Sequence, residues 1–393
     1  MEIIPSTFST PNPVMFGEGT ASVVGEKLKG MGCKKVLVVF DKGIKASGVA
    51  DKIAGYIESA GIETVCYDGV IADVPDHSIA TAADFAISHN VDGIVAVGGG
   101  SSLDTAKGVR ILLTNPPPIS RYYAGTGIAL TDVLSSLKPL IVLPTTSGTG
   151  SEVSPGGVIV NTETNFKEHI LCPVTLGIID PELTLAMPQS VTVITAFDAL
   201  CHAIEAVTSR EPNVFSELFG LKSISLIAKN LPLVLKDGKN LAARGGMHLA
   251  ATMGTMSILG PFCNVPHDIG LIIGMDHDIP HGIASSATLP ESLEFIAPAI
   301  PDTLKKVVEA LGAEIPDGAG AEELGKIANK TTRDLMNLAS LPSIKNYVKS
   351  KEEFLSSVPR IMELQTFYFS PRPVTEADVR DILSKAYDAA PQL

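Results

Sequence analysis

Several residue types are scarce in this sequence, and each shortage excludes a class of protein. Among 393 residues there is no tryptophan, aromatic residues make up 5%, and the five cysteines are scattered without a C-x-x-C pair. An odd number of isolated cysteines argues against a disulfide framework and against a zinc knuckle. The N-terminal stretch MEIIPSTFSTPNPV lacks the basic and apolar regions of a signal peptide. We therefore expect a protein of a reducing compartment and predict a cytoplasmic location.

Positive charge and long apolar runs are also scarce. The 30 basic residues are outnumbered by 43 acidic ones, which gives a net charge of −13. Such an acidic chain argues against a nucleic-acid partner and against an anionic membrane surface. No uncharged apolar run reaches the roughly 18 residues of a membrane span, so we expect no membrane partner. With 45% hydrophobic residues, the chain should fold as two domains or one large one.

The first half alternates short β-branched runs with helix-like stretches such as ASVVGEKLKG and TAADFAISHN. This alternation predicts βαβ units and a parallel sheet that is buried on both faces. We therefore predict a Rossmann-like α/β dinucleotide-binding domain over residues 1–188. The expected strands are 35–40, 63–70, 92–100, 137–146 and 177–180, with a hairpin over 156–172 and a surface loop over 114–127.

Strand-like runs almost disappear after about Ser190, and helical patterns take their place. The longest are VTVITAFDALCHAIEAVTS, FSELFGLKSISLIAKNLPLVLK and AARGGMHLAATMGTMSIL. The pattern predicts an all-helical domain over residues 189–393. Further helices are expected over 303–311, 321–338, 351–363 and 375–388, whereas we interpret the segment from His267 to His281 as a loop.

Three polar segments follow predicted strands and are candidates for a nucleotide site. Gly98–Ser101 stands between the strand GIVAV and a helix, where backbone N–H groups can bind phosphate, although a tight turn alone would also favour glycine. Neither the G-x-G-x-x-G nor the Walker spacing is present. Asp41 ends another strand, where it can accept hydrogen bonds from a ribose or cap the next helix. The third segment, PTTSGTGSEVSP, is a hydroxyl- and glycine-rich loop at a strand's carboxyl end.

A second constellation has the chemistry of a metal site. Asp198 and His202 are four residues apart on a predicted helix, so their side chains can share one cation or simply bond to each other. His267, His277 and His281 follow within fifteen residues and allow more than one ligand set. One carboxylate with imidazoles suits Fe²⁺ or Zn²⁺. We interpret the neighbouring Asp268, Asp276 and Asp278 as solvated or outer-shell groups, not as ligands.

Together these motifs resemble the iron-containing (group III) alcohol dehydrogenase family, which is related to glycerol dehydrogenase and dehydroquinate synthase. The resemblance covers nearly the whole chain, from PNPVMFGEGT through GGGSSLDTAK, PTTSGTGSEVSP, FDALCHAIEA and PHGIASSATLP to SPRPVTEADVRDI. It implies an α/β domain that binds NAD, an all-helical metal-binding domain, and an active site between them. It also implies a dimer or larger homo-oligomer.

The resemblance assigns residues to the cofactor and the metal. At position 41 the family has an acid that favours NAD over NADP. The implied cofactor contacts are Gly99, Gly100, Ser101 and Asp104 at the phosphates, Thr145, Thr146 and Thr149 along the adenosine, and Val153 and Lys167 nearer the ribose and nicotinamide, with Asp41 at the ribose. The implied ligands of one divalent metal, with Fe²⁺ favoured over Zn²⁺, are Asp198, His202, His267 and His281.

The sequence departs from the family pattern near the expected substrate. Leu271 stands where the family has a second histidine close to the nicotinamide, and Asp76 replaces an asparagine that helps to bind cofactor. We therefore predict that His277 serves as the proton relay. The favoured function is NAD(H)-linked oxidation of a small alcohol, or reduction of the aldehyde, with the metal as Lewis acid. The alternatives are a hydroxyacid–oxoacid transhydrogenase, a dehydroquinate synthase-like lyase and a metal-free binder.

Overall fold

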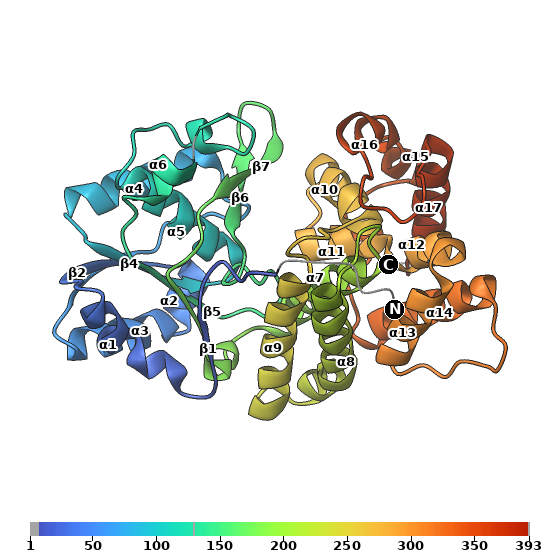
Figure 1. Cartoon of the computed structure of the whole chain (residues 1–393), viewed down its shortest axis with the longest axis horizontal. Helices are drawn as coiled ribbons and strands as arrows, with labels where there is room; N and C mark the ends of the chain where they lie inside the picture. Colours follow the sequence, from blue (N-terminus) through green and yellow to red (C-terminus); the bar gives the residue numbers. More distant parts are fainter. Residues whose placement is uncertain (1–7, 129, 392–393) are drawn as a thin grey trace. The chain divides into compact units, whose positions relative to one another are not determined.

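A computed structural model describes residues 8–128 and 130–391, which divide into two compact units (Figure 1). The α/β unit is Thr10–Met187, and the helical unit combines the described residues from Pro188 onward with Phe8 and Ser9. Phe8 groups with the helical unit, because its ring stacks on Phe215 at a centroid distance of 4.8 Å. The expected first domain, 1–188, therefore differs from the α/β unit at its N-terminal end.

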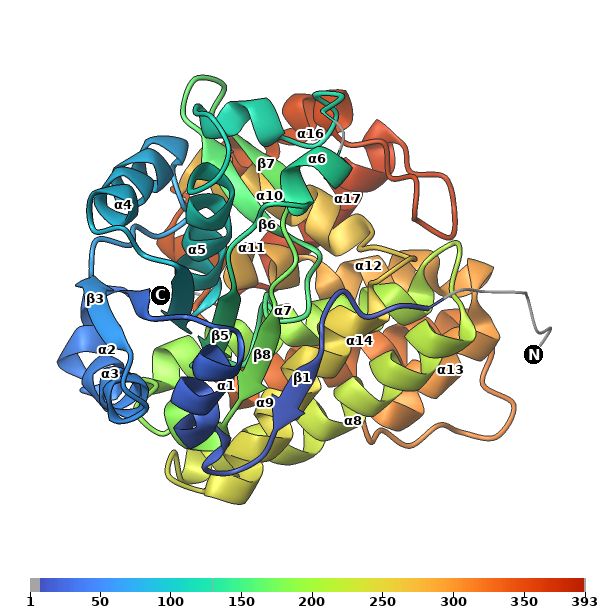
Figure 2. The same cartoon turned by 60° about the vertical axis from the view of Figure 1, so that its left-hand side comes forward.

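The α/β unit is built on a six-stranded sheet in which every pairing is parallel (Figure 2). The strand order is β1-β8-β5-β4-β2-β3. The bounds are β1 Val14–Phe16, β2 Lys35–Val39, β3 Glu63–Tyr67, β4 Gly93–Gly98, β5 Leu140–Pro144 and β8 Leu176–Ile179; β6 Gly156–Asn161 and β7 Phe166–Leu171 form a separate antiparallel hairpin. The predicted parallel sheet is confirmed.

Alternate residues of the central strands enter two separate cores. Leu37 and Val39 of β2 pack with helices α4 (Asp76–Ser88) and α5 (Gly100–Leu112), whereas Val36 and Val38 pack with α1 (Val24–Gly30) and α3 (Val49–Ser59). Successive side chains of a strand point to opposite faces, so the sheet is covered by helices on both sides. After Lys35, the run VLVV is apolar throughout because both of its faces are buried.

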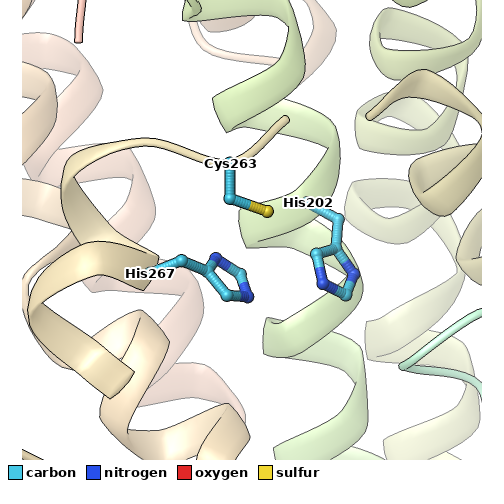
Figure 3. A group of neighbouring side chains, drawn as sticks. All are labelled: His202, Cys263 and His267. Atoms are coloured by element: carbon cyan, nitrogen blue, oxygen red, sulfur yellow. The ribbon is translucent and has the colours of Figure 1, made fainter. Parts of the chain in front are cut away.

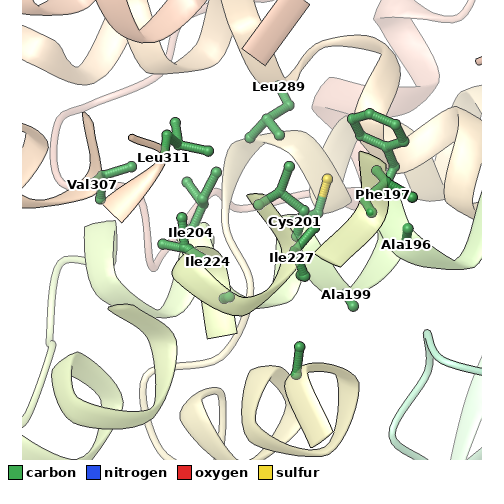
Figure 4. Packing of buried hydrophobic residues seen from close by; sticks show 14 of the residues in the cluster. Ala196, Phe197, Ala199, Cys201, Ile204, Ile224, Ile227, Leu289, Val307 and Leu311 are labelled. Carbon is green, nitrogen blue, oxygen red and sulfur yellow. The ribbon is translucent and has the colours of Figure 1, made fainter. Parts of the chain in front are cut away.

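The helical unit packs α7 (Gln189–Thr208), α8 (Val214–Lys236) and α9 (Leu241–Ser257) around a core that includes Ile204, Ile224 and Ile227 (Figure 4). By length and composition, α7 and α8 could each span a membrane, but 83% of the apolar window of α7 is buried within the structure. Its hydropathy is therefore that of a core helix. The remaining helices are α10 Val265–His277, α11 His281–Ala287, α12 Leu289–Ile296, α13 Pro301–Ala310, α14 Ala321–Leu338, α15 Lys351–Leu355, α16 Val358–Leu364 and α17 Glu376–Ala389.

Two expectations about local structure were wrong. The segment from His267 to His281, expected as a loop, lies in α10 as far as His277 and reaches the start of α11 at His281. Ile269, Ile272 and Ile273 of α10 make a buried stripe at helical spacing. The helix expected over 351–363 is two helices, since Pro359 in the first turn of α16 cannot continue a helix from α15. The expected loop 114–127 includes a 3-10 turn over Ile119–Tyr122, and β1 was not predicted at all.

One buried histidine in α9 should make the helical unit sensitive to acid. His248 is fully buried, neither of its ring nitrogens has a hydrogen-bond partner among the described residues, and burial lowers its pKa from 6.5 to about 3. Between these values the unfolded chain binds a proton that the folded chain does not, so stability falls with falling pH by up to about 1.4 kcal/mol per pH unit. We expect His248→Leu to lose less stability than the parent between pH 7 and pH 5 in urea denaturation. The exposed His77→Leu is the control, and equal losses in all three proteins would contradict this assignment.

Candidate active site

Helix α7 presents three ionisable side chains on one face. Asp198, His202 and Glu205 follow one another at i, i+4 and i+7, a spacing that aligns side chains along a helix. All three are buried, although most of the other buried residues of the helix are apolar. Buried charged groups require partners, so this face must meet further polar groups.

The partners are two histidines from the next helices along the chain. His267 lies in the first turn of α10 and His281 is the first residue of α11. Asp198 Oδ1 lies 3.9 Å from His202 Nε2, 3.6 Å from His267 Nε2 and 3.6 Å from His281 Nε2. The structure thus brings together the four residues predicted as metal ligands.

The quartet has the donor atoms of a cation site, and two of its buried polar atoms lack a hydrogen-bond partner among the described residues. Asp198 Oδ1 and His267 Nε2 are buried and have no hydrogen-bond partner within the described residues. An acceptor-only oxygen and imidazole nitrogens that face one another at these distances suit a divalent ion such as Fe²⁺ or Zn²⁺. His281, with 35% of its side chain exposed, is the most accessible of the four. The residues present therefore fit the predicted metal.

Charge within the quartet favours the ionised carboxylate. Burial alone would raise the pKa of Asp198, but the facing imidazoles outweigh it and hold that pKa well below its usual range. For His267, burial works against the charged form, yet Cys263, Glu205 and Asp198 together raise its pKa well above 6.5. Without a metal, the site therefore favours an ionised Asp198 beside a protonated His267. A cation that binds there displaces the imidazole proton.

Glu205 orients His267 from behind. Its Oε1 lies 2.5 Å from His267 Nδ1, and its Oε2 accepts hydrogen bonds from the backbone N–H of Asn264 at 2.6 Å and of His267 at 3.3 Å. A carboxylate that binds Nδ1–H leaves Nε2 as the lone-pair nitrogen that faces Asp198. We did not assign Glu205 from the sequence, although its i+7 spacing from Asp198 was the available signal.

We expect Glu205→Gln to weaken metal binding by about 10–100-fold without unfolding the chain. The amide keeps the size of the side chain but no longer carries the charge that holds the Nδ1–H tautomer of His267. Metal affinity is measured by competition with a chelator. Glu217→Gln, which removes a surface carboxylate paired with Lys306 on another helix, is the matched control. An unchanged affinity in Glu205→Gln would contradict the positioning role.

His277 does not join the quartet in the described structure. It ends α10, where its Nε2 lies 3.1 Å from Ser357 Oγ. Ser357 in turn donates to Asp276 Oδ2 at 2.6 Å, and Asp276 pairs with Arg360 of α16. At about 1.5 Å rise per residue, His277 stands roughly 15 Å along the helix axis from His267. These contacts anchor α10 to α16, and the predicted proton relay at His277 stays a prediction.

The nucleotide-site candidates meet at the carboxyl edge of the sheet. The chain leaves β2 toward β3 on one side and leaves β4 toward β5 on the other, which makes the β2/β4 crevice a topological switch point of the kind where such sheets bind ligands. Asp41 follows β2 and Gly99 follows β4. Asp41 Oδ1 accepts from the N–H groups of Gly43 and Ile44, so the carboxylate caps α2 (Lys42–Ala46), the alternative that the sequence left open.

The glycine turn and the hydroxyl loop are packed against each other. Gly98 has φ +151°, and a Cβ there would stand 2.3 Å from Ser102 Oγ. A Cβ on Gly100 would stand 2.8 Å from Thr149 Cγ2, and Gly99 similarly faces Thr146. The glycines are therefore required by the approach of the 144–151 loop as well as by the turn. Gly99 is the N-cap of α5, so Gly100 and Ser101 lie at a helix N-terminus, where anions bind favourably.

The other predicted cofactor residues have varied surroundings. Asp104 accepts from Ser151 Oγ at 2.6 Å and from the Val158 N–H at 3.0 Å, so its carboxylate joins α5 to the neighbouring loop and hairpin. Lys167 on β7 pairs with Asp73 at 2.9 Å. Thr145 and Val153 are buried. Asp76, which replaces the family's asparagine, accepts from Thr162 Oγ1 at 2.7 Å.

Comparison with known proteins matches both halves of the chain to one family. The family described as iron-containing alcohol dehydrogenase matches residues 11–181, and its C-terminal counterpart matches residues 192–387. A choline dehydrogenase of Bacillus subtilis is 31% identical over 97% of this chain and 93% of its own length. A 1,3-propanediol dehydrogenase of Citrobacter freundii is 31% identical over 97% and 98%. The solved alcohol dehydrogenase of Oenococcus oeni is 29% identical, with a TM-score of 0.90 over 98% of this chain and 100% of its own.

One matched relative bears on the alternative function. A mitochondrial hydroxyacid-oxoacid transhydrogenase of Bos taurus is 28% identical over 97% of this chain and 89% of its own length. The fold, the quartet and the matches define the class of the protein as an oxidoreductase of the dehydrogenase type. More particularly, the chain belongs to the iron-containing alcohol dehydrogenase family.

Proposed function

We propose that the chain is a metal-dependent, NAD(H)-linked alcohol dehydrogenase that interconverts a small alcohol and its aldehyde. The observation that carries this proposal is the convergence of Asp198, His202, His267 and His281 in a chain of this family. Fe²⁺ is the proposed metal because the family is described as iron-containing, and Zn²⁺ suits the same donors.

Residues of the helical unit would bind the metal, and residues of the α/β unit would bind the nucleotide. Asp198 and the three histidines would hold the metal, and Glu205 would keep His267 in the tautomer that binds it. When bound, the metal would supply Lewis-acid polarisation of the substrate oxygen, and the nicotinamide would supply the acceptor for the hydride. The N-terminus of α5 would bind the pyrophosphate through the backbone N–H groups around Gly100.

The remaining cofactor assignments also stay proposals. Asp41 at the end of β2 would accept from the ribose and disfavour the extra phosphate of NADP. Its capping bonds use Oδ1, and they fix the carboxylate at the switch point. We propose that the residues along the rest of the dinucleotide are Gly99, Ser101, Asp104, Thr145, Thr146, Thr149, Val153 and Lys167.

Two substitutions at His277 distinguish a role in proton transfer from a role in holding α10 against α16 through the bond to Ser357. We expect His277→Gln to keep turnover and its pH profile, because the amide can still bond to Ser357 Oγ but cannot carry a proton near neutral pH. His277→Phe removes the bond as well and should lower only thermal stability. A drop in turnover with a changed pH profile in His277→Gln would instead establish the relay predicted from the sequence.

We further propose a soluble cytoplasmic enzyme that acts on a small molecule and assembles as a dimer or larger homo-oligomer. The family membership supports this proposal. Relatives are named for choline and for 1,3-propanediol, so the substrate panel should span charged and neutral short-chain alcohols.

The test is an assay of metal-loaded enzyme, purified without oxygen or chelator, with that panel and NAD or with the aldehydes and NADH. We expect NADH formation from at least one short alcohol, faster with NAD than with NADP. Loaded enzyme that transfers no hydride to or from free cofactor would overturn the proposal. Turnover that requires a second oxo acid and no free NAD would identify the transhydrogenase instead.

A further inference from the structure

The geometry of the quartet depends on how α7 and α10 are held against each other. Asp198 and His202 belong to α7, whereas His267 belongs to the first turn of α10. The rings of His202 and His267 stack at a centroid distance of 4.8 Å, and Figure 3 shows them facing each other from the two helices. A shift of α10 along or away from α7 would therefore change the distances between the proposed donor atoms.

The side chain of Asn264 joins the two helices. Asn264 is the N-cap residue of α10, and its Nδ2 donates to the backbone carbonyl of Glu205 at 2.8 Å and lies 3.4 Å from Thr208 Oγ1. Glu205 is among the last four residues of α7, whose carbonyls have no donor within their own helix. The amide of Asn264 therefore completes the hydrogen bonding at the end of α7 from the position where α10 begins.

The backbone of Asn264 also fixes the carboxylate that orients a ligand. Its N–H donates to Glu205 Oε2 at 2.6 Å, while the other oxygen of this carboxylate lies 2.5 Å from His267 Nδ1. Asn264 and Glu205 are both buried, so water does not compete for these bonds. Asn264 thus binds Glu205 at its carbonyl and at its carboxylate, and Glu205 meets His267.

Capping of α10 alone would use only the oxygen of this side chain. Asn264 Oδ1 accepts from the Val265 N–H at 2.8 Å, which leaves Nδ2 for α7. Asn240 is a cap of the same residue type at the start of α9, where its Oδ1 accepts from the Ala243 N–H at 3.0 Å. Helix α9 carries no member of the quartet. The two asparagines therefore share the capping role and differ in the bonds to α7.

We propose that Asn264 is a positioning residue of the metal site, which holds α10 on the end of α7 so that His267 Nε2 stays beside Asp198. It acts through Glu205, the residue that its side chain and its backbone both bind. Donors that are held in place before the ion arrives lose less freedom when it binds, which raises the affinity. This inference rests on the proposed metal site.

The substitution Asn264→Ser separates the two uses of the side chain. Serine caps a helix about as well as asparagine, but it is too short to reach the Glu205 carbonyl and carries no amide. We expect the metal-free full chain with Asn264→Ser, titrated with Zn²⁺ against a competing chelator, to bind one equivalent about tenfold more weakly than the parent. Asn240→Ser is the matched control and should keep the parent affinity. Circular dichroism establishes that both variants fold.

A double variant tests the route through Glu205. If Asn264 acts through this residue, Glu205→Gln/Asn264→Ser should bind Zn²⁺ within about twofold of Glu205→Gln alone. Parent affinity in Asn264→Ser, an equal loss in Asn240→Ser, or a further tenfold loss in the double variant would overturn the inference and leave the proposed dehydrogenase intact. A parent protein that binds no Zn²⁺ would overturn both.

Discussion

Asp198→Asn is expected to remove the metal and to lower turnover at least about a thousandfold, the loss that corresponds to several kcal/mol of Lewis-acid stabilisation. The substitution keeps the shape of the side chain but deletes the negative charge that faces three imidazoles at 3.6–3.9 Å. The remaining donors are neutral imidazoles, which compensate a divalent charge poorly in a buried site. Elemental analysis should find well under one equivalent of metal.

The control for this experiment is Asp302→Asn, which removes an exposed carboxylate at the start of α13 and should leave metal content and turnover unchanged. Circular dichroism establishes that both variants fold. A full equivalent of metal in Asp198→Asn, with undiminished turnover, would mean that the quartet is not the catalytic site.

Lys107→Met is expected to destabilise the α/β unit by about 3–5 kcal/mol, the usual cost of breaking a buried ion pair. Lys107 is fully buried, and its ammonium donates to Asp104 Oδ1 at 3.2 Å and to Ser151 Oγ at 2.6 Å. Without the ammonium, the Asp104 carboxylate, with 13% of its side chain exposed, would keep an uncompensated charge. The loss is measured by urea denaturation.

The double variant Asp104→Asn/Lys107→Met should recover part of this loss, because it removes both charges together. Lys326→Met is the surface control and should change little, since its partner Glu322 is also exposed. We expect NAD affinity to fall in Lys107→Met as well, because this network ties α5 to the loop that faces the glycine turn. Unchanged stability would show that Lys107 is solvated in solution.

The sequence predicted two kinds of element: strands that are buried on both faces and are therefore apolar, and helices whose apolar residues recur with the helical period. Strands β4 and β5 are apolar throughout, and β2 is apolar after Lys35, because the sheet is covered on both faces. Helix α14 has the regular stripe of a surface helix. β1 escaped prediction because it has only three residues, with Phe16 45% exposed, and is defined only by its pairing with β8. No local pattern encodes such a pairing.

The quartet was predictable only through the resemblance, because local spacing linked Asp198 with His202 but could not choose among the later histidines. Tertiary packing of α10 and α11 against α7 selects His267 and His281 and leaves His277 bonded to Ser357.

The stacking of Phe8 on Phe215 has a consequence for the order in which the chain folds during synthesis. Phe8 and Ser9 are made before the α/β unit but belong to the helical unit, whose other described residues all follow Met187. The α/β unit can close on itself as soon as it has emerged, because its segment is continuous and domains generally fold as units. The helical unit can be completed only after the residues that follow Met187 have been made. The contact between Phe8 and Phe215 therefore forms only then. A helical unit expressed alone from Pro188 would lack Phe8 and would expose the rings of Phe215 and Phe219 that Phe8 covers.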